Sequence, residues 1–211
     1  ISRALINISS DGEHPNTIHL AEGTYSPSLT DEKFPINCRS YVSVSGAGTQ
    51  ATTLNPENKF EVFKARDYEN SYSLSNLSIT TSDDEYAESA IYLMLPNNVT
   101  ISNIRIHGYN RKELSLASPA ITDALNLPTS LYLNNVEIND NVGAKAANFG
   151  VIEDCVINNL IVRNNIPNYN ADTISGGGIG FGGHPDFHDR YNYKLINSEI
   201  TNNINAAWEW P

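Results

Sequence analysis

The segment His184-Pro-Asp-Phe-His-Asp-Arg190 has the highest density of side chains that can do chemistry in this 211-residue sequence. In an extended segment alternate side chains point to the same side, so His184, Asp186 and His188 would share one face. Two imidazoles and a carboxylate form a common three-ligand set for a transition metal. The segment therefore predicts a metal or catalytic site, with an exposed loop insertion as the alternative. The sequence requires no cofactor, and a divalent metal is the one candidate.

The acidic run Asp83-Asp84-Glu85 is a second candidate site. A glycoside hydrolase needs two carboxyl groups about 5 to 9.5 Å apart, one as acid and the other as base or nucleophile. Asp83 and Asp84 can supply such a pair, and the alternative is a solvated acidic loop.

The glycine-rich stretch 176–183 is no nucleotide loop, because neither a Lys-Ser/Thr pair nor a helical pattern follows it.

Charge and composition exclude several classes of protein. The chain has 24 acidic and 13 basic side chains, a formal net charge of -11 and 40% hydrophobic residues. Such an acidic chain is poorly suited to bind nucleic acid or an anionic membrane, and no window of about 18 apolar residues predicts a membrane span. The hydrophobic content argues against disorder. The 28 asparagines outnumber the acidic residues and require a structural explanation.

The elements that must position these side chains are almost all predicted to be strands. Only the opening residues 1–6 have a helical pattern, and we expect residues 1–16 to form a short N-terminal cap. The remainder alternates apolar and polar residues in short runs separated by Gly, Pro, Asn and Ser, which is typical of an all-β protein. One degenerate repeat recurs, with an apolar residue, an asparagine two positions later and a β-branched residue three positions further on. The asparagines of its five copies are Asn76, Asn103, Asn135, Asn159 and Asn197.

The spacing of the repeat predicts a solenoid. The asparagines lie 27, 32, 24 and 38 positions apart, so a constant strand motif alternates with loops of variable length. Coils stacked about 4.8 Å apart accommodate such loops outside the stack. Asparagine tolerates the left-handed backbone of a bend, and its amide can bond to the same amide one coil above and below. We therefore expect asparagine ladders that satisfy buried amides, and tight corners with positive φ at Gly23, Gly46 and Gly48.

The N-terminal coils carry the most specific motifs. These are Thr-Ile-His-Leu-Ala-Glu-Gly-Thr-Tyr at 17–25, Phe-Pro-Ile at 34–36, and Tyr-Val-Ser-Val-Ser-Gly-Ala-Gly at 41–48, followed by Thr53. In this order they resemble the first coils of a family of uncharacterised bacterial and archaeal surface β-helix proteins, over roughly residues 1 to 55. The later coils resemble only the wider pectate-lyase-like superfamily, through the asparagine repeat and Gly-Gly-Gly-Ile at 176–179.

This resemblance implies a right-handed parallel β-helix of about seven coils, in which residues 17–211 follow the cap within one domain. Residues 200–211 are similar to the middle of a turn, so we expect the chain to be part of a longer solenoid. The superfamily contains lyases, hydrolases, epimerases, tailspikes and adhesins, so the fold alone does not define the activity. Cys38 and Cys155 can form a disulfide or remain buried thiols, since two cysteines are no disulfide framework.

The repeat register places two columns of side chains on one outer sheet face, two and four positions after each asparagine. The first column is Ser78, Arg105, Glu137, Ile161 and Glu199, and the second is Thr80, His107, Asn139, Arg163 and Thr201. Arg105 beside Glu137 is most simply a surface ion pair. The alternative is a carbohydrate groove, because lyases of the superfamily that the chain resembles place Arg or Lys on such a face.

In such a groove the candidate catalytic residues are Arg105, His107, Glu137 and Arg163, and Asn139 would bind substrate. Tyrosines predicted to be exposed could stack on sugar rings, and these are Tyr109, Tyr169, Tyr191 and Tyr193. The sequence favours an extracellular or cell-surface protein that binds a polysaccharide, another surface glycan or a partner protein. The alternative is a polysaccharide-active enzyme, either a lyase or a glycoside hydrolase.

Overall fold

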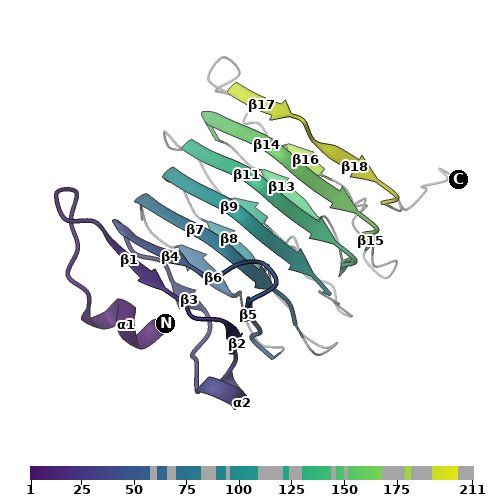
Figure 1. Cartoon of the computed structure of the whole chain (residues 1–211). Helices are drawn as coiled ribbons and strands as arrows, with labels where there is room; N and C mark the ends of the chain where they lie inside the picture. The colour runs from purple at the N-terminus through teal and green to yellow at the C-terminus, as the bar shows by residue number, and fades with distance from the viewer. Residues whose placement is uncertain are drawn as a thin grey trace, which may run out of the picture.

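The computed structural model describes residues 1–57, 61–65, 70–81, 89–93, 96–108, 121–123, 130–143, 146–149, 152–167, 179–181 and 192–203. These residues form mainly β structure with two short helices, α1 (Ser2–Asn7) and α2 (Pro27–Thr30). Figure 1 shows long strands side by side in chain order from the N-terminal to the C-terminal end. The predicted β class and the predicted helix at the start of the chain are confirmed. Within the described residues, none of the helices is long and apolar enough to cross a membrane.

The larger sheet has ten strands, and all its strand pairs are parallel. Its main path follows the chain through β1 (Asn16–His19), β4 (Val42–Ser45), β7 (Asn70–Ile79), β9 (Asn97–His107), β11 (Ser130–Asn139), β14 (Asp154–Arg163) and β17 (Asn192–Ile196). Three shorter strands extend this path: β2 (Gly23–Tyr25), β5 (Thr52–Leu54) and β18 (Glu199–Thr201). Parallel neighbours need a long connection between them, and the spacing of the repeats supplies it.

A second parallel sheet is built from the segments between these long strands. Its members in chain order are β3 (Ile36–Asn37), β6 (Phe63–Ala65), β8 (Ile91–Leu93), β10 (Ile121–Asp123), β13 (Ala147–Phe149) and β16 (Ile179–Phe181). A small third sheet pairs β12 (Val142–Gly143) with β15 (Ile166–Pro167). The chain thus alternates between the two larger sheets, and within the described residues neither of them closes on itself.

The two larger sheets share one hydrophobic core. In the first sheet Leu74, Ile101, Leu133 and Ile157 are paired along one column, and each is at most 2% exposed. In the second sheet Phe63 and Phe149 are fully buried. Each such side chain stabilises the fold by about 1.5–3 kcal/mol. Cys38 and Cys155 are both buried and form no disulfide, which supports the buried-thiol interpretation.

The five repeat asparagines all adopt the predicted left-handed backbone, with φ between 49° and 57°. The amides of Asn103, Asn135 and Asn159 each donate to the repeat asparagine one strand earlier, with Nδ2–Oδ1 distances of 3.0, 3.0 and 2.6 Å. We call Asn76, Asn103, Asn135 and Asn159 the surface asparagine ladder. Asn197 departs from it and donates to Asn158 at 3.4 Å.

The expectation that this ladder is buried is wrong. Asn103, Asn135 and Asn159 are exposed and Asn76 is half-buried. The left-handed residue interrupts the alternation of the strand, so that two consecutive side chains, such as Asn134 and Asn135, point outward between inward-facing neighbours. The ladder therefore presents a row of amides to solvent.

A second ladder lies six positions after the repeat asparagines of the last three strands, and this one is buried. Asn141 and Asn165 are 1% and 2% exposed, and Asn203 is half-buried. Asn141 Nδ2 donates to Asn165 Oδ1, and Asn165 Nδ2 donates to Asn203 Oδ1, both at 2.9 Å. We call these three residues the buried asparagine ladder. It satisfies buried amides by repetition, as expected for an asparagine-rich stack, but at positions that the repeat did not predict.

The predicted glycine corners are confirmed at two of three positions. Gly23 and Gly48 have φ values of +138° and +147°, a region that side chains rarely adopt. The prediction for Gly46 is wrong, because its φ is not in the positive range. A Cβ atom at Gly46 would instead lie 2.3 Å from the backbone oxygen of Asn76, so glycine is needed there for close approach.

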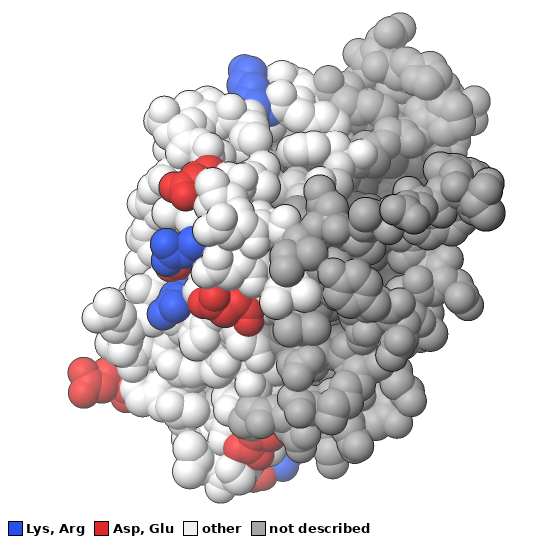
Figure 2. Space-filling model, turned by 90° about the vertical axis from the view of Figure 1, so that its right-hand side faces the viewer, with Lys and Arg blue, Asp and Glu red and all other residues white. Residues whose placement is uncertain are grey.

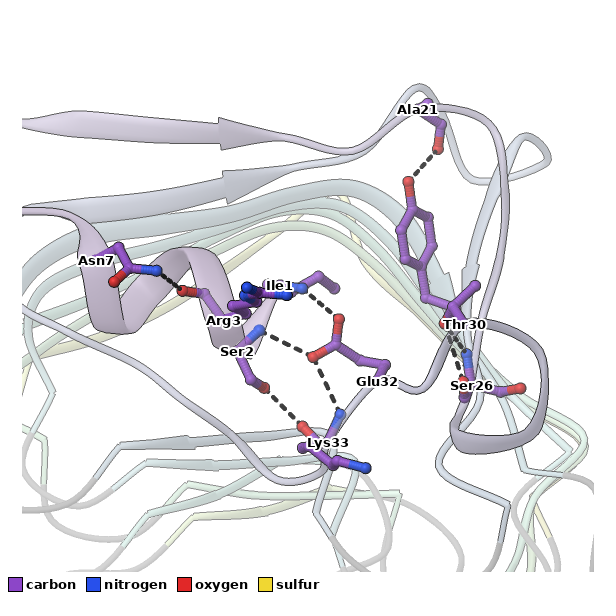
Figure 3. A network of polar contacts seen from close by, with 10 residues as sticks. Ile1, Ser2, Arg3, Asn7, Ala21, Ser26, Thr30, Glu32 and Lys33 are labelled. Carbon is purple, nitrogen blue, oxygen red and sulfur yellow. Dashed lines mark hydrogen bonds and ion pairs between the residues drawn. The ribbon is translucent and has the colours of Figure 1, made fainter.

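Glu32 connects the N-terminal helix to the rest of the fold through hydrogen bonds (Figure 3). Its side chain is buried, and its carboxylate accepts hydrogen bonds from the amino group of Ile1 and from Ser2 N, the latter at 2.9 Å. The Ser2 hydroxyl adds a bond of 2.7 Å to the carbonyl of Lys33. The helix also buries Leu5 and packs against β3. The N-terminal end of the core is therefore covered by α1.

This arrangement makes the stability of the chain depend on pH. Burial alone would raise the pKa of Glu32, but hydrogen bonds from the Ile1 amino group and Ser2 outweigh it and hold the pKa below its ordinary value of 4.5. The resulting stabilisation is complete above that value and is lost as the pH falls through the lowered pKa. We expect Glu32→Gln to cost about 1.5 kcal/mol at pH 7 and to flatten the acid limb of urea unfolding curves recorded over a pH series. Glu13→Gln, at an exposed carboxylate, is the control, and an equal flattening in that variant would contradict the assignment.

Candidate functional site

The strand register aligns the two columns that the repeat predicts. In the first column Arg105 pairs with Ser78 and Glu137, and Ile161 pairs with Glu137 and Glu199. In the second column Asn139 pairs with His107 and Arg163, and Arg163 pairs with Thr201. Side chains from five successive strands of the first sheet, β7 to β18, are thereby brought to one outer face.

Two members of the columns are not open to solvent. Ser78 is 2% exposed, and its hydroxyl donates to the carbonyl of Thr49 from the loop between β4 and β5. Asn139 is 1% exposed, and its amide contacts Arg105 and Asp140. The prediction that Asn139 binds substrate directly therefore does not fit its burial. Its hydrogen bonds suit it instead to orient the Arg105 side chain.

Arg105, Glu137 and Arg163 form a charged cluster on the outer face. Glu137 lies between the two arginines, with Arg163 Nη2 at 2.5 Å from Oε1 and Arg105 Nε at 3.6 Å from Oε2. The side chains are 38%, 26% and 46% exposed in the order of the sequence, so each ion pair contributes under about 1 kcal/mol to stability. The predicted surface ion pair is confirmed, and Figure 2 shows acidic and basic side chains next to one another on the face that it presents. Two guanidinium groups against one carboxylate leave the cluster with one formal positive charge.

A groove of about 370 Å³ adjoins this cluster. It crosses strands β7, β9, β11 and β14, and the surface asparagine ladder lines it along this direction. Arg105, Glu137 and Ile161 form one side, and Gly48 and Thr49 contribute from the loop after β4. The groove therefore combines a row of amides at the spacing of the strands with a guanidinium group and a carboxylate.

His107 follows Arg105 on β9 and is half-buried. Burial and the positive charge of Arg105 lower the pKa of His107, and Asp140 and Glu137 offset part of this effect. Because the ordinary pKa is 6.5, the imidazole is uncharged at neutral pH. It can accept a proton or a hydrogen bond beside the guanidinium of Arg105.

Tyr193, predicted to bind sugar, has a structural role on β17. Its hydroxyl accepts a hydrogen bond of 3.2 Å from Ile152 N, and its ring packs edge-on against Phe181 with centroids 5.2 Å apart. The other predicted residues lie outside the described residues, namely Asp83, Asp84, Tyr109, Tyr169, His184, Asp186, His188 and Tyr191. Among the residues that the structure does describe, no group of three or more His, Cys, Asp or Glu side chains could hold a metal ion.

Sequence reasoning missed the role of the surface asparagine ladder as a groove wall and the contribution of Gly48 and Thr49. The ladder was found through the repeat, but its exposure depends on the left-handed backbone and not on residue type. The loop residues have no local signal, because only the stacking of strands brings them beside Arg105 and Ile161.

Comparison with known proteins gives no match to a family model, to a curated protein or to a solved structure.

Proposed function

We propose that this chain is a right-handed parallel β-helix of the pectate-lyase-like type that binds a glycan outside the cell or at its surface. The alternation of the chain between two parallel sheets with one core supports the solenoid, since each repeat contributes a strand to both. The observation that carries the binding function is the groove along the surface asparagine ladder beside Arg105 and Glu137.

The groove suits a polymer with hydroxyl groups. Asn103, Asn135 and Asn159 each use one of their two N–H donors for the asparagine one strand earlier, so a donor remains for a ligand on each of β9, β11 and β14, about 4.8 Å from the next. Arg105 lines the groove, and Arg163, which binds Glu137 from beside it, holds part of the charge of that carboxylate, so an acidic sugar is favoured over a neutral one. A guanidinium group binds a sugar carboxylate with charge-assisted hydrogen bonds.

Titration calorimetry with polygalacturonate and a neutral β-glucan tests this function. We expect the acidic polymer to bind more tightly and Arg105→Ala to weaken that binding about tenfold, because a charge-assisted contact is lost. Glu137→Gln should instead strengthen it, since the two arginines lose their internal carboxylate partner. Arg3→Ala, on the exposed surface of α1, is the matched control. Absence of binding to both polymers, or equal losses in the Arg105 and Arg3 variants, would contradict the proposal.

A lyase is the second candidate, and the uncharged His107 beside Arg105 is the observation that favours it. An arginine that neutralises a uronate carboxylate and an adjacent base that removes the neighbouring proton are the groups such a reaction needs. Incubation with polygalacturonate distinguishes the two functions. Unsaturated chain ends that disappear in His107→Asn would identify the enzyme, whereas binding without product supports the glycan-binding protein.

A further inference from the structure

Asp140 follows strand β11 directly, next to the charged cluster, at a position that the repeat did not predict. It is exposed and adopts the left-handed backbone, with φ 57°. Gly108 follows β9 in the same way, with φ +71°, and Asn164 follows β14, with φ 56°. The left-handed bend is therefore built with glycine or asparagine on the neighbouring strands, and the bend itself does not require an aspartate.

The carboxylate of Asp140 fixes the orientation of the buried amide of Asn139. Its Oδ2 accepts a hydrogen bond from Asn139 Nδ2, and its Oδ1 accepts one of 3.0 Å from Asn164 Nδ2. On the other side, Asn139 Oδ1 accepts a bond of 3.2 Å from Arg105 Nε. A carboxylate only accepts and a guanidinium only donates, so one of the two orientations of the Asn139 amide can bond to both. Asp140 therefore acts on Arg105 through Asn139.

This arrangement leaves the terminal amino groups of Arg105 for a ligand. Within the part of the chain that the structure describes, Arg105 makes both its hydrogen bond to Asn139 and its ion pair with Glu137 through Nε. Arg163 differs, because it places its terminal Nη2 on Glu137. Arg105 also lines the groove and is 38% exposed, so its two terminal groups are available there as a planar pair. Such a pair matches the two oxygens of a carboxylate with two parallel hydrogen bonds.

We propose that Asp140 is a positioning residue, which holds Arg105 through Asn139 so that both terminal amino groups bind one sugar carboxylate. The proposal rests on the glycan-binding function proposed above, and adds that the groove recognises the carboxylate by its planar shape as well as by its charge. By charge alone, an acidic residue next to the groove would repel an acidic polymer. Positioning and charge therefore predict opposite effects when the carboxylate of Asp140 is removed.

Asp140→Gly and Asp140→Asn form a matched pair of variants for this test. Both remove the same charge at a bend that accepts either residue, but only asparagine keeps an oxygen that can accept from Asn139 Nδ2. In titration calorimetry with polygalacturonate, we expect Asp140→Gly to bind about fivefold more weakly than the native chain, and Asp140→Asn to stay within about twofold. Arg105→Lys should also bind about fivefold more weakly, because lysine keeps the charge but not the planar pair. Asp154→Asn removes an exposed carboxylate at the start of β14, and this control should not weaken binding.

Nitrogen-15 NMR of the ligand-free chain gives a second readout that does not depend on glycan binding. We expect the Arg105 Nε proton to exchange slowly with water in the native chain and in Asp140→Asn, and several-fold faster in Asp140→Gly. Its signal is assigned by its absence from Arg105→Lys.

The two readouts separate failure of this proposal from failure of the glycan function. Equal exchange in the native chain and Asp140→Gly overturns the positioning role, and so does equal polymer binding by the two Asp140 variants. Polygalacturonate binding by Arg105→Lys as tight as that of the native chain overturns recognition by the terminal pair. If the native chain binds no polygalacturonate but the exchange rates differ as expected, the glycan function fails and the positioning of Arg105 by Asp140 is upheld.

Discussion

Replacing Gly46 with alanine is expected to lower the free energy of unfolding by about 3 kcal/mol, because the new methyl group has no space. Its carbon would lie 2.3 Å from the backbone oxygen of Asn76 and 2.9 Å from Cβ of Thr52. The Asn76 oxygen cannot move freely, since it accepts a hydrogen bond of 2.9 Å from Gly48 N. Asn76 also begins the surface asparagine ladder. The clash therefore displaces backbone that supports the groove.

Urea unfolding followed by circular dichroism measures this effect. Gly12→Ala is the matched control, because a Cβ atom there makes only ordinary contact, 3.5 Å from the Tyr41 ring. We expect that variant to change the stability by at most about 0.5 kcal/mol. Gly48→Ala should lie between the two, at about 1–2 kcal/mol, since its cost is backbone strain at φ +147° and not a clash. Equal losses for Gly46→Ala and Gly12→Ala would show that the close approach to Asn76 is absent.

Replacing Asn165 with leucine is expected to cost about 3 kcal/mol or more, because it breaks the buried asparagine ladder at its centre. Asn165 Oδ1 accepts from Asn141 N and from Asn141 Nδ2, at 3.2 and 2.9 Å. Its Nδ2 donates to Asn203 Oδ1 and to the carbonyl of Ile138, at 2.9 and 3.0 Å. Leucine has a similar branched shape but removes these four hydrogen bonds, although Asn203 Oδ1 still accepts from Asn165 N and Asn141 Nδ2 still donates to the carbonyl of Ile106. Desolvation without replacement bonds is the source of the loss.

The surface asparagine ladder provides the control for this variant. Asn103→Gly removes one amide from it while keeping the left-handed backbone, and water can hydrate the exposed neighbours. We expect a loss of about 1 kcal/mol, measured by the same urea unfolding. If both variants lost the same free energy, burial of the second ladder would be refuted. The comparison therefore separates a ladder that stabilises the core from one that is available to a ligand.

The sequence predicted the features that depend on neighbours along the chain. Alternating side chains identified the strands, and the recurring asparagine identified the left-handed bend of each long strand after β4. Because both signals recur with constant internal spacing, they also predicted which residues of β9, β11 and β14 stand side by side. This was sufficient to place Arg105 next to Glu137 and His107 next to Asn139.

Only the tertiary structure determines which side chains are buried and which backbone segments lie in close contact. Ser78 and Asn139 are outward-facing by register, yet both are buried, and Gly46 is constrained by a carbonyl that belongs to a residue 30 positions later. The buried asparagine ladder likewise depends on residues 24 and 38 positions apart reaching the same depth in the core. These outcomes follow from the way loops of unequal length fold against the stacked strands. Backbone preference is a local property and can be predicted from the sequence, whereas the surroundings of a side chain depend on segments that meet only after folding.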